Sequence, residues 1–126
     1  MADGRFATAV NCMDGRTQVP VFEYIRRSYS VDYVDMVTEA GPDKILGEGK
    51  SPLVESIKSR VAISVKKHGS RVIAVVSHHE CAGNPVSKEM HLINLGDSIK
   101  RVSSWFQGVR VIGLWVDENW RVHEVK

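Results

Sequence analysis

The hydrophobic and polar positions of this chain follow two alternating periodicities. Short apolar runs rich in β-branched residues are typical of strands, and apolar residues at every third or fourth position are typical of helices. Runs of the first kind are separated by segments of the second kind, and the last two runs form a hairpin. The pattern predicts strands at 6–10, 31–37, 71–76, 109–116 and 120–125, with helices at about 17–28, 51–67 and 84–106.

Capping and breaking residues refine these elements. Ser51–Pro52 and Asn84–Pro85 each place a capping side chain before a proline, which is typical of a helix start. The segment 41–44, Gly-Pro-Asp-Lys, is read as a turn or, equally, as a functional loop, and 47–50 continues the irregular stretch. Gly96–Asp97 leaves open whether the last helical pattern is one helix or two. The alternation predicts an α/β fold, with a mostly parallel central sheet, helices on both faces and an antiparallel edge hairpin at the C-terminus.

Composition narrows the class of protein. The chain has 126 residues, which predicts one domain, 1–126, with a formal net charge of +2. This charge gives no argument for binding nucleic acid or a membrane surface, and no apolar stretch is long enough to span a membrane. The first residues are polar and no signal-peptide core follows them, so we expect a cytoplasmic protein. Two cysteines do not make the disulfide framework of a secreted protein.

Both cysteines lie where predicted strands end. Cys12, Asp14 and Arg16 follow the first strand, and His78 and Cys81 follow the strand at 71–76. If these strands are neighbours, their carboxyl ends meet at one edge of the sheet, where ligands bind in such folds. Two thiolates and one imidazole form a ligand set suited to Zn²⁺, and three ligands leave a position for water. Zinc would acidify that water and supply hydroxide as a nucleophile.

Asp14 and Arg16 suit a role beside the metal, but other readings remain open. Asp14, kept ionised by Arg16, could orient the zinc-bound hydroxide, or it could itself be the fourth ligand and close the site. The two residues could also form a plain surface ion pair. The cysteines could be buried free thiols in a metal-free binding module. A redox pair is disfavoured because their spacing is not Cys-x-x-Cys.

The combination Cys12-x-Asp14-x-Arg16 and His78-x-x-Cys81 resembles the signature of the β-class carbonic anhydrases. The resemblance implies zinc bound by the two cysteines and the histidine, an Asp-Arg dyad, reversible hydration of CO₂ to bicarbonate, and homodimers or multiples of dimers. The chain resembles a short, divergent member. The family usually has glycine directly after the second cysteine, whereas this chain has Ala82 and then Gly83.

Two alternative functions accompany this resemblance. Relatives of the fold hydrolyse carbonyl sulfide or carbon disulfide, and a non-catalytic member would use its zinc for structure or sensing. Among nearby residues, His79 is expected to be a non-ligand, and His91 to be structural, although its helix could also bring it near the metal. Glu80 is expected to be either loop surface or an acceptor for an imidazole N–H. The tryptophans are expected in the core or at an interface: Trp105, Trp115 and Trp120.

Overall fold

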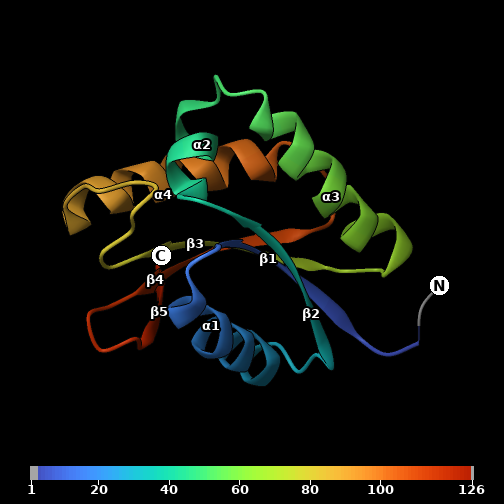
Figure 1. The fold of residues 1–126 in the computed structure, drawn as a ribbon. Helices are drawn as coiled ribbons and strands as arrows, with labels where there is room; N and C mark the ends of the chain where they lie inside the picture. Colours follow the sequence, from blue (N-terminus) through green and yellow to red (C-terminus); the bar gives the residue numbers. More distant parts are fainter. Residues whose placement is uncertain (1–2, 126) are drawn as a thin grey trace.

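A computed structural model describes residues 3–125, and these residues form an α/β fold around one five-stranded sheet (Figure 1). The spatial order of the strands is β2-β1-β3-β4-β5; the first four are parallel, and β5 runs antiparallel to β4. This is the predicted architecture. Its strands are β1 (Phe6–Cys12), β2 (Tyr33–Glu39), β3 (Val72–His78), β4 (Arg110–Val116) and β5 (Val122–Val125), and its helices are α1 (Gly15–Ser28), α2 (Pro42–Glu48), α3 (Leu53–Lys67) and α4 (Lys88–Ser103).

The helices cover both faces of the sheet, α1 on one and the other three on the opposite one (Figure 1). Side chains alternate along each strand, so each strand contributes to two cores. Ala7 and Ala9 of β1 pack in the cluster that contains Val21 of α1, whereas Val10 belongs to the cluster with Leu46 of α2. None of the helices in the described part of the chain is both long and apolar enough to cross a membrane.

The region between β2 and α3 differs from the sequence prediction. The expected turn at 41–44 and irregular stretch at 47–50 contain the short helix α2, which begins at Pro42. Gly41 and Gly49, both in the left-handed conformation, flank this helix. Because glycines are typical of turns and loops, local propensity predicted an irregular segment here. Tertiary packing stabilises this helix, because the side chain of its residue Leu46 is fully buried. The strand before it also lies two residues later than predicted, at Tyr33–Glu39.

The start of α4 is a second correction. Ser87 caps this helix by accepting a hydrogen bond from the Met90 amide at 3.2 Å, so the helix does not begin at Asn84–Pro85. Asn84 is instead buried and donates to the Asn94 side chain at 3.0 Å. The helix then continues through Gly96 without a break.

Candidate metal centre

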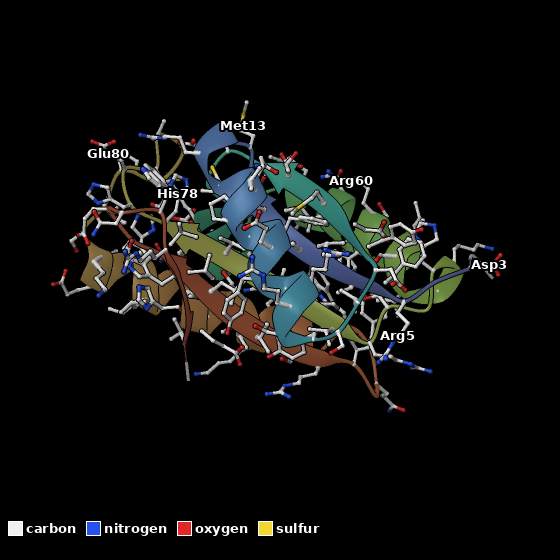
Figure 2. All side chains as sticks on the ribbon, turned by 90° about the horizontal axis from the view of Figure 1, so that it is seen from below. Asp3, Arg5, Met13, Arg60, His78 and Glu80 are labelled. Carbon is white, nitrogen blue, oxygen red and sulfur yellow. The ribbon has the colours of Figure 1, made fainter. Side chains whose placement is uncertain are left out.

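The predicted ligands meet at the carboxyl edge of the sheet. Cys12 is the last residue of β1 and His78 the last of β3, so both belong to strands rather than to the loops after them. These two strands are hydrogen-bonded neighbours, as the sequence argument required. Cys81 follows three residues later in the loop before α4. Figure 2 shows His78 and Glu80 at the end of the sheet opposite to Arg5, which precedes β1.

The separations within this group match the needs of a tetrahedral ion. The Sγ atoms of Cys12 and Cys81 are 3.9 Å apart, and the ligand atoms of these cysteines and His78 all lie within 4.8 Å of one another. Two sulfurs bound to one zinc ion at about 2.3 Å in tetrahedral geometry are about 3.8 Å apart. All three side chains are buried, and no other His, Cys, Asp or Glu in residues 3–125 joins the group.

The imidazole of His78 is oriented for coordination. Its Nδ1 is 2.7 Å from the carbonyl oxygen of His79, which fixes the proton on that nitrogen. Its Nε2 is buried and has no hydrogen-bond partner. A buried polar atom without a partner costs free energy, and a bound metal would satisfy it. The acceptor for the imidazole N–H is therefore a backbone carbonyl, and Glu80 does not take that role.

The two thiols differ strongly in acidity. The hydrogen bond from Cys81, aided by the nearby His78, lowers the pKa of the Cys12 thiol to about 4. The same hydrogen bond and burial raise the pKa of Cys81, so the pair holds one proton between two sulfurs. Burial alone would lower the pKa of His78, but Cys12, the His79 carbonyl and the charge of Asp14 together outweigh burial and raise it. Cys12 is thus a thiolate near neutral pH, and a metal would displace the proton of Cys81.

Asp14 and Arg16 form a pair beside this cluster. Asp14 is the N-cap of α1: its Oδ1 accepts the backbone N–H of Arg16 at 2.9 Å. The Arg16 guanidinium donates to Asp14 Oδ1 at 3.1 Å and to Oδ2 at 2.8 Å. These hydrogen bonds lower the pKa of Asp14 to about 2. Both carboxylate oxygens therefore face Arg16, and Asp14 is not among the three clustered ligands.

Two glycines let the loop of Cys81 approach the end of β2. A Cβ atom on Gly83 would lie 2.6 Å from the backbone nitrogen of Gly41, and one on Gly41 would lie 2.8 Å from the Gly83 carbonyl oxygen. Contacts this short with backbone require the chain to move. The glycine one position later than usual, after Ala82, is therefore a packing requirement of this loop.

A family model described as "Putative carbonic anhydrase" matches residues 2–126. The chain belongs to this family. Comparison with curated protein sequences gives no match.

Solved β-carbonic anhydrases have the same fold as this carbonic anhydrase family member. The carbonic anhydrase of Streptococcus mutans is 17% identical with a TM-score of 0.64, over 95% of this chain and 81% of that one. A tetrameric β-carbonic anhydrase of Sordaria macrospora is 13% identical with a TM-score of 0.61, over 94% and 79%. A mutant form of a β-carbonic anhydrase of Aspergillus fumigatus is 12% identical with a TM-score of 0.61, over 99% and 91%.

Sequence reasoning missed two features around the site of this carbonic anhydrase family member. Glu80 accepts a hydrogen bond from Arg16 at 2.9 Å, and the ring of Trp120 lies 4.4 Å from the Arg16 guanidinium carbon. Asp43, expected in a turn or a functional loop, is buried and accepts hydrogen bonds from two side chains, His91 and Ser77. In the sequence, only the opposite charges of Arg16 and Glu80 indicated that these two residues could pair. Nothing near Trp120 or Asp43 in the sequence indicated their contacts.

Proposed function

We propose that this chain is a zinc-dependent carbonic anhydrase, a single domain over 1–126 that reversibly hydrates CO₂ to bicarbonate. Cys12, His78 and Cys81 are the proposed ligands. Two observations carry the proposal: a ring nitrogen of His78 and the two thiol sulfurs lie within 4.8 Å of one another, and Nε2 of His78 is buried without a hydrogen-bond partner. When bound, zinc supplies a Lewis acid that brings the pKa of a coordinated water close to neutral.

The protein's own groups prepare this site. The His79 carbonyl keeps the proton on Nδ1 of His78, so the lone pair of Nε2 is available on the side of the cysteines. Cys12 is ionised before metal arrives, which reduces the number of protons that binding must release to one. Burial of all three side chains limits the access of bulk water and strengthens electrostatic interactions within the site.

Asp14 and Arg16 are the proposed catalytic dyad. Asp14 stays ionised down to a pH of about 2, so at neutral pH it can only accept hydrogen bonds. It would accept one from the attacking nucleophile and orient the lone pair of that nucleophile toward the carbon of CO₂. Arg16 donates to both oxygens of Asp14, and this carboxylate, which can still accept a further hydrogen bond, lies outside the group of three ligands. This arrangement supports an open site with three protein ligands rather than a closed site with Asp14 as the fourth.

We also propose that the chain assembles as a homodimer or a multiple of dimers. Met13, directly after the first ligand, and Val19 on α1 expose 65% and 62% of their surfaces. Exposed apolar side chains of this size favour association with another surface. The Sordaria macrospora relative is described as tetrameric.

Metal content and CO₂ hydration, measured on the same sample, test the function. Protein purified without chelator and supplied with Zn²⁺ under reducing conditions should hold about one zinc per chain by elemental analysis and hydrate CO₂ in a stopped-flow pH-indicator assay. Light scattering on that sample gives the assembly. Cys81→Ser should abolish zinc binding. Asp14→Asn should keep zinc but lower kcat roughly a hundredfold, which is the low end of the effect of a side chain positioned on a proton of the reacting group.

The control is Asp97→Asn, which removes an exposed carboxylate on α4 and should change neither quantity. Zinc retained at full stoichiometry in Cys81→Ser would refute the ligand assignment, and full turnover in Asp14→Asn would remove the dyad from the mechanism. If the protein holds zinc and hydrolyses carbonyl sulfide or carbon disulfide but does not hydrate CO₂, the proposed substrate is wrong and one of these two compounds takes its place. Zinc without any turnover would indicate a structural or sensory site, and no zinc at all would overturn the proposal.

A further inference from the structure

Three separate segments of the chain contact the guanidinium group of Arg16. Asp14 accepts from it at the start of α1, and Glu80, in the loop after β3, accepts from Nη1 at 2.9 Å. Trp120, in the β4–β5 hairpin, places its ring 4.4 Å from the guanidinium carbon. Arg16 therefore contacts two carboxylates and an aromatic ring.

Both added contacts come from residues with an unfavourable backbone conformation. Among the non-glycine residues of 3–125, only Ser30, Glu80 and Trp120 have a positive φ, and the values at Glu80 and Trp120 are 57° and 60°. Such strain persists where the surrounding structure enforces it and is concentrated at functional sites. Two of the three residues with a strained backbone thus contact the same arginine, Arg16.

The strain at Trp120 is specific to the turn it occupies. The Trp120 amide donates to the Asp117 carbonyl at 2.9 Å, and the Asp117 amide donates to the Arg121 carbonyl at 3.0 Å. In a three-residue hairpin loop of this kind, the last loop residue is left-handed and is usually glycine. A tryptophan at this position destabilises the turn, so its side chain must contribute elsewhere. Its ring packs against the Arg16 guanidinium and the apolar cluster beneath α1, and its centroid lies 6.2 Å from that of the His78 ring and 6.5 Å from that of the His79 ring.

We infer that Trp120 and Glu80 are positioning residues, which hold Arg16 so that Asp14 remains paired with it and leaves the fourth coordination position of the metal free. This inference rests on the proposed function. Alone, the pair of Asp14 and Arg16 would be weak, because the Arg16 side chain is 47% exposed and exposed ion pairs break readily. A released Asp14, two residues from Cys12, is a carboxylate of the kind that zinc accepts as a ligand.

Trp120 should contribute more than Glu80 to this restraint. Its ring packs on the apolar cluster and is held in place, whereas the Glu80 side chain is 64% exposed and competes with water for its hydrogen bond. Arginine stacks well on an aromatic face because its guanidinium is planar and weakly hydrated. Loss of the ring therefore frees Arg16 more than loss of the Glu80 charge.

Azide binding to the Co²⁺-loaded protein measures access to the fourth position without relying on turnover. Cobalt has visible absorption bands that change when azide coordinates, so a titration gives the azide Kd. Trp120→Gly removes the ring while relaxing the turn, and Trp120→Leu keeps an apolar side chain on the cluster. Both should raise the azide Kd roughly fivefold, within the range for a lost cation–π contact, and Glu80→Gln should raise it about twofold.

A second substitution identifies the competing ligand. If a released Asp14 blocks the position, Asp14→Asn combined with Trp120→Leu should return the azide Kd to the value of Asp14→Asn alone. The control is Glu118→Gln, an exposed carboxylate on the same hairpin, which should leave the Kd unchanged. Circular dichroism melting confirms that each variant is folded, and Trp120→Leu decides the test if Trp120→Gly does not fold.

The outcomes separate this inference from the function on which it rests. A wild-type protein that binds no Co²⁺ overturns the proposed metal centre, and the inference with it. Wild type that binds Co²⁺ and azide, with both Trp120 variants equal to it, overturns the inference alone. So does a weakened azide affinity that Asp14→Asn fails to restore, because the loss would then come from distortion of the site rather than from Asp14.

Discussion

Asp43 provides the sharpest test of how the fold holds the site. It lies in the first turn of α2, is 1% exposed, and joins three elements. Its Oδ2 accepts a hydrogen bond from Nδ1 of His91 on α4 at 2.6 Å and one from the hydroxyl of Ser77 on β3 at 2.8 Å. Because Ser77 directly precedes His78, this carboxylate holds in place the end of the strand that carries a proposed metal ligand.

The substitution Asp43→Asn keeps the size of the side chain and removes its charge. The charge-assisted hydrogen bond to His91 contributes about 1.5–3 kcal/mol, and weakening the bond to Ser77 costs about 1 kcal/mol more. His91 offers little relief, since a change of tautomer would bury an N–H on its Nε2, which has no partner. We therefore expect a loss of about 3 kcal/mol in the free energy of unfolding, which corresponds to about 10 °C in Tm for a chain of this size.

Urea unfolding followed by circular dichroism measures this loss, with zinc removed by chelator so that metal binding does not contribute. Asp97→Asn, an exposed acid on α4, is the matched control and should change stability by no more than about 0.5 kcal/mol. With zinc present, Asp43→Asn should also weaken metal binding about tenfold, as loss of an outer support typically does. A stability loss under about 1 kcal/mol would refute the assignment of Asp43 as a buried junction.

Two further predictions concern close packing and acidity. Gly83→Ala should destabilise the protein by about 2 kcal/mol, because its Cβ would lie 2.6 Å from the backbone nitrogen of Gly41. Gly96→Ala, by contrast, has open space around the new Cβ and should stabilise α4 by about 0.5–1 kcal/mol. Equal midpoints of urea unfolding for the two variants would contradict this packing. Burial and the Glu124 carboxylate raise the pKa of Tyr29 to about 12, so its contribution to stability should be present below about pH 10 and be lost as pH rises through about 12. Carbon-13 NMR of labelled tyrosine should place this midpoint near 12 and lower it in Glu124→Gln; a native midpoint near the ordinary value of about 10 would show that the reasoning fails.

Much of the fold and the core of the candidate site could be predicted because they depend on local patterns and one general rule. The strand 71–76 is apolar nearly throughout, which is typical of a parallel strand covered on both faces. The carboxyl ends of neighbouring parallel strands share one edge, so Cys12 and His78 had to approach if β1 and β3 pair, as they do. Periodicity and topology carry this information without knowledge of any side-chain contact.

Helix ends and short helices were predicted less well, because tertiary contacts override local propensity there. The segment Pro42–Glu48 is rich in turn-forming residues but is helical, since burial of Leu46 and the hydrogen bonds of Asp43 outweigh the weak intrinsic preference. Asparagine is a good capping residue, but the side chain of Asn84 donates a hydrogen bond to the side chain of Asn94 on α4 instead. Boundaries of this kind depend on what packs against a segment as well as on its own residues.

The amino-acid sequence by itself determined the order of the five strands and the three longer helices, the sheet edge at which the candidate site forms, and the cysteines and histidine that meet there. Only the tertiary structure decided how the site is held: Trp120 and Glu80 on Arg16, a backbone carbonyl on His78, and glycines that admit the Cys81 loop. The physical reason is that most of the residues in these contacts are far apart in the sequence. Periodicity acts over a few residues, whereas Arg16 and Trp120 lie far apart along the chain, and such contacts exist only after the sheet has brought their segments together.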